Sequence, residues 1–71
     1  MTDEREPWED EMVEGYRDGL DRNAPEPSKN RSYSYHHGFA NGRADITLTG
    51  RAVASDLRIM AEQAIDRDMG R

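Results

Sequence analysis

A five-residue phrase occurs twice in this 71-residue chain and limits what the chain can fold into. Each copy reads glycine, aromatic residue, two small or polar residues, glycine. In a helix, residues four apart lie one above the other, so each copy would form a bare glycine stripe beside an aromatic ring. A glycine inside a helix costs about 1 kcal/mol relative to alanine, so matched pairs favour close packing of two helix backbones. The repeat therefore predicts a packed helix pair, unless the glycines are the C-caps of two short helices. The copies are Gly15-Tyr16-Arg17-Asp18-Gly19 and Gly38-Phe39-Ala40-Asn41-Gly42.

Apolar residues recur at helical spacing in three segments. The first predicted helix covers residues 7–21, where every fourth residue from position 8 is apolar or aromatic. The second covers 33–45 and starts after Ser32 or Ser34, either of which can cap it. The third covers 51–68, and its apolar face has the clearest pattern. The residues of that face are Val53, Leu57, Met60, Ala61, Ala64 and Ile65.

The segment between the first two predicted helices, residues 23–30, contains Pro25 and Pro27. We therefore expect an extended connector there rather than a helix. The predicted fold is all-α, a single small helical domain over residues 1–71. Its first two helices form a helical hairpin with the glycine repeats in contact, and the third, amphipathic helix packs across them.

The chain has little material for a core. Leucine, isoleucine, valine and phenylalanine number nine of 71 residues, below the roughly 20 % expected of a folded domain with high charge. One tryptophan, three tyrosines and four methionines add large side chains, so we expect a small folded unit of marginal stability. There is no cysteine, which excludes disulfides and thiolate metal sites. No apolar run suggests a signal peptide or a transmembrane helix, and a cytoplasmic protein is predicted.

The net charge of −5 is unevenly distributed: residues 1–27 carry −7, residues 28–51 carry +3 and residues 52–71 carry −1. A negative average argues against nonspecific binding to nucleic acid, whose affinity comes largely from cations at phosphates. The basic middle, however, interleaves cations with aromatic residues, a combination that binds phosphates and stacks on unpaired bases. The candidate RNA-binding residues are Arg17, Lys29, Arg31, Tyr33, His36 and Arg43.

Catalytic and metal sites are not predicted. His36 and His37 are adjacent, so they point to different helix faces, and no third ligand has a suitable spacing. The sequence contains no context for a Ser-His-acid arrangement and no phosphate-binding or dinucleotide loop. We therefore expect a protein that is not an enzyme and that needs no cofactor or metal.

From Glu14 to Asp45 the chain resembles the ribosome modulation factor family of small bacterial proteins. The resemblance rests on the doubled motif, the proline-containing connector and the tail Gly42-Arg43-Ala44-Asp45. It implies association with the ribosome near its messenger RNA channel, where members favour dormant, dimerised particles. The chain departs from the family in its acidity, in the residues 23–25 that replace a Cys-Pro-Tyr turn, and in its third helix. The matched family positions are Gly15, Tyr16, Gly19, Gly38, Phe39, Gly42 and Arg43.

The leading prediction is a noncatalytic, ribosome-modulation-factor-like regulator of translation that binds ribosomal RNA or a ribosomal protein. One alternative is a small acidic phage or mobile-element inhibitor that occupies a basic nucleic-acid-binding surface, so that its partner is a basic protein. The acidic residues of that partner surface are Glu9, Asp10, Glu11 and Glu14. A second alternative is a homodimeric structural subunit that completes its small core with a second copy. None of these predictions involves a membrane.

Overall fold

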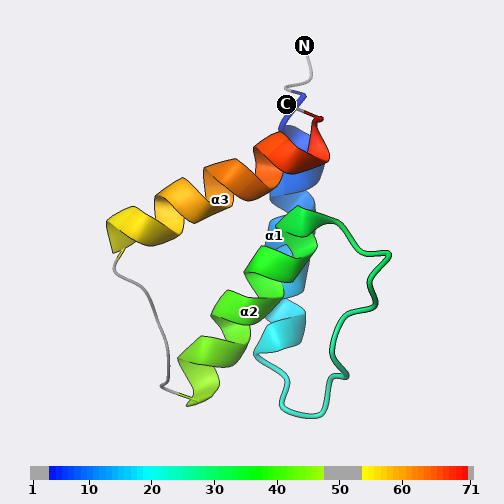
Figure 1. Cartoon of the computed structure of the whole chain (residues 1–71). Helices are drawn as coiled ribbons and strands as arrows, with labels where there is room; N and C mark the ends of the chain where they lie inside the picture. The colour runs from blue at the N-terminus through cyan, green and yellow to red at the C-terminus, as the bar shows by residue number, and fades with distance from the viewer. Residues whose placement is uncertain (1–3, 48–53, 71) are drawn as a thin grey trace.

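The computed structural model describes residues 4–47 and 54–70. Within these ranges the chain forms three helices and no strand (Figure 1). The predicted all-α class is confirmed, and the first two helices begin and end within two residues of the predicted positions. The predicted start of the third helix, residues 51–53, lies outside the described residues. No described helix is both long enough and apolar enough to cross a membrane. The helices are α1 (Glu6–Gly19), α2 (Tyr33–Thr47) and α3 (Ala54–Asp68).

The connector between α1 and α2 covers residues 20–32, so it is longer at both ends than the predicted 23–30. At its start the Leu20 N–H donates to the Tyr16 carbonyl and ends α1. The Asn23 N–H then donates to the Asp21 carboxylate at 2.9 Å, a short polar turn that leads into the proline-containing stretch. In Figure 1 the connector runs back beside the helices, from the end of α1 to the start of α2.

α1 and α2 run in the same direction, and the predicted helical hairpin, whose helices would be antiparallel, is wrong. Gly15 lies against Tyr35 and Gly19 lies against Phe39, so the contact positions advance together along both helices (Figure 1). Extended backbone covers about 3.3 Å per residue and a helix about 1.5 Å, so residues 20–32 are long enough to return along the full length of α1. The proline-containing connector therefore permits the parallel arrangement.

The contact between α1 and α2 has an approximate two-fold relation. Adding 23 to the numbers of the α1 residues gives the α2 residues, so that Gly15 corresponds to Gly38 and Gly19 to Gly42. A Cβ atom at any of these glycines would lie well inside 3.0 Å of a carbonyl oxygen on the other helix, so the two backbones touch. We call these contacts the glycine seam; they are Gly15 on Tyr35, Gly19 on Phe39, Gly38 on Met12 and Gly42 on Tyr16.

The apolar core is small. Tyr35 and Phe39 of α2 and Ile65 of α3 are the buried hydrophobic side chains in the described ranges, and the two rings stack with centroids 6.3 Å apart. α3 packs mainly on α2 and contacts α1 only slightly, rather than packing across both helices as predicted. Part of its predicted apolar face is therefore open to solvent, and Met60, which was expected in the core, is 46 % exposed.

Candidate functional site

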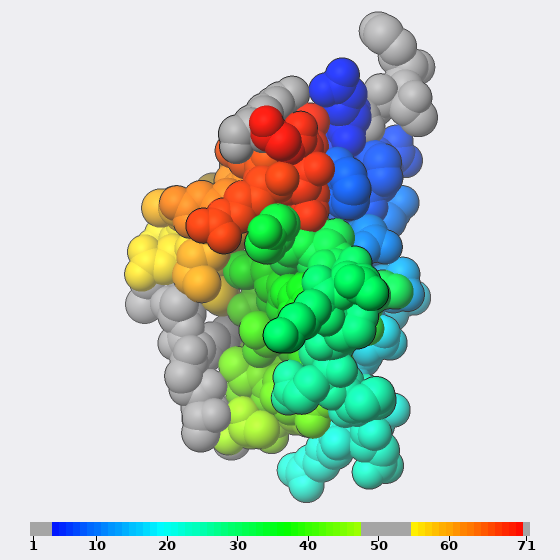
Figure 2. Space-filling view, turned by 45° about the vertical axis from the view of Figure 1, so that its right-hand side comes forward, coloured from blue at the N-terminus to red at the C-terminus, as the bar shows by residue number. Residues whose placement is uncertain are grey.

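An open groove of about 880 Å³ lies where all three helices meet the end of the connector. In Figure 2 the end of α3 (orange to red), the first turns of α1 (blue) and the start of α2 (green) come together on one face. Four of the predicted RNA-binding residues line this groove, together with an aromatic ring from α1. The lining residues are Pro7, Trp8, Glu11, Lys29, Asn30, Arg31, Ser32, Tyr33, His36 and Asp68.

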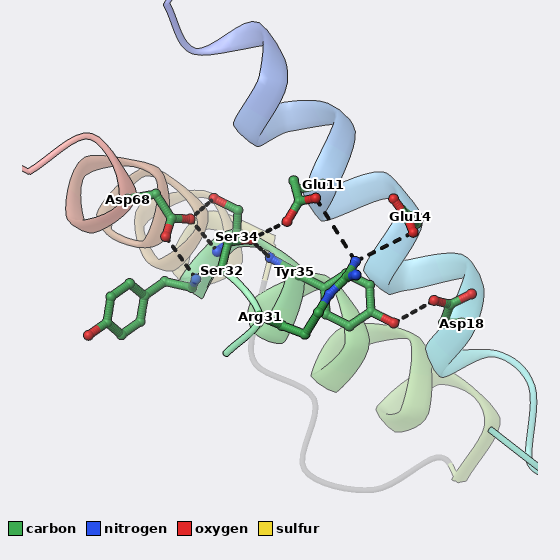
Figure 3. A network of polar contacts seen from close by, with 9 residues as sticks. Glu11, Glu14, Asp18, Arg31, Ser32, Ser34, Tyr35 and Asp68 are labelled. Atoms are coloured by element: carbon green, nitrogen blue, oxygen red, sulfur yellow. Dashed lines mark hydrogen bonds and ion pairs between the residues drawn. The ribbon is translucent and has the colours of Figure 1, made fainter. Parts of the chain in front are cut away.

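The N-terminus of α2 forms the base of this site, and its backbone donors are fully used (Figure 3). Ser32 is the cap: its hydroxyl accepts from the Tyr35 N–H at 3.0 Å and donates to Glu11 at 2.7 Å. The Asp68 carboxylate accepts from the N–H groups of Tyr33 at 2.9 Å and Ser34 at 2.7 Å, and from the Ser34 hydroxyl at 2.6 Å. A carboxylate is favoured there because the helix N-terminus is partly positive. The end of α3 is thus fastened to the start of α2.

Arg31, near the end of the connector, is held against α1 and the Tyr35 ring of α2 (Figure 3). One terminal nitrogen lies 3.4 Å from Glu14 and 4.0 Å from Glu11, and the guanidinium carbon lies 3.7 Å from the centroid of the Tyr35 ring. The Tyr35 hydroxyl in turn donates to Asp18. That hydrogen bond, together with burial, raises the pKa of Tyr35. Arg31 therefore lines the groove but is already engaged within the molecule.

Arg43 also has internal partners. Its guanidinium donates to the carbonyls of Arg22 at 3.3 Å and Ala24 at 3.0 Å, and lies 4.9 Å from the Phe39 ring centroid. Arg43 therefore fastens the returning connector to α2. It lies outside the groove, and so does Arg17, which is exposed on α1. The structure thus brings four of the six predicted RNA-binding residues together and leaves these two apart.

The adjacent histidines diverge, as the sequence indicated. His36 lines the groove, and its Nε2 lies 3.0 Å from the Ser28 carbonyl in the connector. His37 lies on the other side, with its Nε2 3.1 Å from the Asn41 amide nitrogen, and burial lowers its pKa. Among residues 4–47 and 54–70, no group of three or more His, Cys, Asp or Glu side chains is arranged to bind a metal ion.

Two groove residues are available to a ligand. Tyr33 is 54 % exposed, with the Arg67 guanidinium 5.5 Å from its ring centroid. The Lys29 ammonium is exposed and has no hydrogen-bond or ion-pair partner in the described part of the chain. The half-buried Trp8 completes the aromatic lining. The groove thus combines a free cation with two aromatic rings.

The four acidic residues predicted as a partner surface are divided between two roles. Glu11 and Glu14 contact Arg31, and Glu11 also accepts from Ser32. Glu9 and Asp10 are exposed and have no side-chain partner within the described ranges. The acids therefore do not form one uniform free surface.

Sequence reasoning missed two groove residues. Trp8 was assigned to the apolar stripe of the first helix, yet it also lines the groove. Asp68 was assigned no role, because its partners lie 34 and 35 positions away in the sequence. The one signal that could have identified Trp8 as a groove residue is its place directly after Pro7, in the first turn of the helix. Side chains at the end of a helix often lie next to other elements.

Comparison of the chain with protein-family models, with curated proteins and with solved structures finds no match.

Proposed function

We propose that this protein is a noncatalytic, ribosome-modulation-factor-like regulator that binds an unpaired stretch of ribosomal RNA in the groove. The observation that supports this proposal most directly is the meeting of Lys29 and His36 with the rings of Trp8 and Tyr33 in one open groove. Single-stranded RNA is bound by cations that contact phosphates and by aromatic rings on which bases stack. Because ribosomes are cytoplasmic, this proposal places the protein in the cytoplasm.

The negative side chains of the groove are compatible with this partner. Asp68 accepts three hydrogen bonds at the start of α2, and Glu11 is paired with Ser32 and Arg31. Their charges are therefore offset by the helix N-terminus and by a cation. Lys29 contributes the unpaired charge that a phosphate would meet.

In this proposal the arginines of the connector and the glycine repeats have a positioning role. Arg31 and Arg43 attach the connector to the helix pair, and the Gly-aromatic-x-x-Gly copies set the distance between the helices. The groove is then shaped by the parallel pair, and the exposed Lys29 and Tyr33 contact the ligand.

The test uses Lys29→Gln and Tyr33→Ala, because both side chains are exposed and neither makes a side-chain hydrogen bond or ion pair in the described ranges. Loss of one stacking ring costs about 1 to 3 kcal/mol, so Tyr33→Ala should weaken binding to a single-stranded RNA roughly 5- to 150-fold. Lys29→Gln should reduce the salt slope of binding by roughly 0.7. Fluorescence anisotropy measures both effects, and cosedimentation with purified bacterial ribosomes tests the partner. Arg58→Gln, an exposed cation outside the groove, is the matched control.

Substitutions at Glu9 and Asp10 distinguish RNA binding from the alternative of an acidic inhibitor, because both side chains are exposed and have no partner in the described ranges. If the protein binds RNA, the double variant Glu9→Gln with Asp10→Asn should bind RNA with unchanged or higher affinity, since its repulsion from the phosphates is smaller. An inhibitor of a basic protein would lose its partner on the same change and tolerate Lys29→Gln. Ribosome binding that is indifferent to Lys29→Gln and Tyr33→Ala together would refute the proposed groove.

A further inference from the structure

α1 carries a partly exposed apolar stripe at helical spacing, on the side of the helix that flanks the glycine seam. Val13 is 54 % exposed, Tyr16 36 % and Leu20 40 %. Their spacing of three and four residues places them on one side of the helix. The Tyr16 hydroxyl donates to Asp45 of α2, but its ring is partly exposed like the other two side chains. The described ranges bury only three hydrophobic side chains, so three large exposed ones on one helix are a considerable apolar surface.

The two-fold relation between α1 and α2 allows this stripe to be compared with the equivalent positions on α2. A shift of 23 residues converts Val13, Tyr16 and Leu20 into His36, Phe39 and Arg43. On α2 that face is covered by the connector: Arg43 donates to its carbonyls, His36 contacts Ser28, and the Phe39 side chain is buried. The corresponding face of α1 is exposed.

The charged side chains of α1 and its C-terminal turn that have no partner are separated along the helix, whereas Glu14, Asp18 and Asp21 in its C-terminal half have partners of their own. The acids without a partner lie on the N-terminal side of the stripe and the arginines on its C-terminal side. All of them are exposed, and none has a side-chain partner in the part of the chain that the structure describes. The acids are Glu6, Glu9 and Asp10, and the arginines are Arg17 and Arg22.

We propose that this face is the contact surface of a homodimer, in which α1 packs antiparallel on α1 of a second copy. In that orientation the acidic end of each helix faces the arginine end of the other, whereas a parallel pair would place like charges together. Val13 would pack near the partner's Leu20 in a symmetric contact. Arg17 would lie over the partner's Tyr16, an arrangement of arginine and aromatic ring that the chain itself uses at Tyr33, Tyr35 and Phe39.

The strength of this dimer follows from its size. One face of a short helix buries less than the roughly 1,200 Å² of a standard stable interface. Self-association is therefore weak and reversible, and it weakens with salt because exposed charges set the orientation. The surface lies outside the groove, so the dimer and the proposed RNA binding are separate properties of the molecule.

The test is a charge exchange on the full chain. The variant Arg17→Glu with Arg22→Glu makes the face wholly acidic, and the variant Glu9→Lys with Asp10→Lys makes the opposite end basic. Each variant alone should self-associate at least tenfold more weakly than the wild type in sedimentation velocity over a concentration series. An equimolar mixture should recover dimers, because the acidic and basic faces again match. The circular dichroism spectrum checks that each exposed substitution leaves the helices intact.

The weaker self-association of each variant alone supports the antiparallel pair, since in a parallel pair the wild type would already have like charges facing each other. Recovery in the mixture shows that both variants are folded and associate through this face, since misfolded variants would not restore each other. A wild-type chain that stays monomeric to millimolar concentration overturns the proposal. So does a mixture that stays monomeric, or either variant dimerising like the wild type. RNA binding measured on the same variants separates the two proposals. The variant Arg17→Glu with Arg22→Glu should still bind RNA whether or not the dimer forms. Any loss of affinity should come from general charge repulsion and should disappear when salt is added.

Discussion

At Gly38 the glycine seam leaves no room for a methyl group, and this reverses the usual effect of a substitution. In an open helix, replacing glycine by alanine stabilises by about 1 kcal/mol. Here the new Cβ would overlap the Met12 carbonyl oxygen and lie 2.9 Å from the Tyr16 nitrogen, and neither is the end of a flexible side chain. We expect Gly38→Ala to lower the free energy of unfolding by roughly 1 to 3 kcal/mol in urea denaturation. The control is Ala40→Gly at an exposed position of the same helix, which measures the difference in helix propensity between alanine and glycine alone. A Gly38→Ala variant that is more stable than the wild type would contradict the close packing at the glycine seam.

A second residue-scale prediction concerns His37, whose pKa burial lowers below the ordinary value of 6.5. The folded state then binds the proton more weakly than the unfolded state. Its neutral form contributes stability that is complete above about pH 6.5 and is lost as the pH falls through the folded-state pKa. Urea midpoints between pH 7.5 and pH 4.5 should show this loss, and His37→Gln should reduce it. Equal pH profiles for both proteins would show that His37 is as solvated in the folded state as in the unfolded chain.

At the scale of the elements, α3 is held to α2 by the buried Ile65 and by one carboxylate at its C-terminal end. α3 contacts α1 little, and Asp68 joins it to the first turn of α2 through three hydrogen bonds. Asp68→Ala should cost about 1 to 3 kcal/mol, because it leaves the Ser34 hydroxyl and two backbone donors without their charged acceptor. Amide hydrogen exchange should speed up in α3 and at the start of α2. Asp66→Ala on the same helix is the control, and equal losses from both changes would mean that the cap contributes nothing specific.

At the scale of the whole molecule, periodicity was enough to predict three helices. Ser32 and Ser34 were both candidate caps for the start of α2, and Ser32 is the one that accepts from the backbone there. The direction of α1 relative to α2 was not predictable, because a glycine stripe accepts a second helix in either orientation and the connector length permits both. The groove was only partly predictable. Lys29, Arg31, Tyr33 and His36 are near neighbours in sequence, but the acceptors that engage Arg31 come from α1, and Asp68 comes from the far end of the chain. The exposure of Met60 was not predicted, because the sequence shows which residues of a helix face are apolar but not how much of that face is covered by another element.

The returning connector also has a consequence for how the protein folds. Every contact of the glycine seam joins residues at least 20 positions apart, so no part of the helix pair can form as a local hairpin. The chain must first bring the start of α2 back beside the start of α1, and the entropy of that loop closure is lost before any backbone contact is gained. Pro25 and Pro27 restrict the loop in the unfolded chain and so reduce that entropic loss. The connector therefore governs the rate at which the helices find each other, while the glycines govern how tightly they stay together.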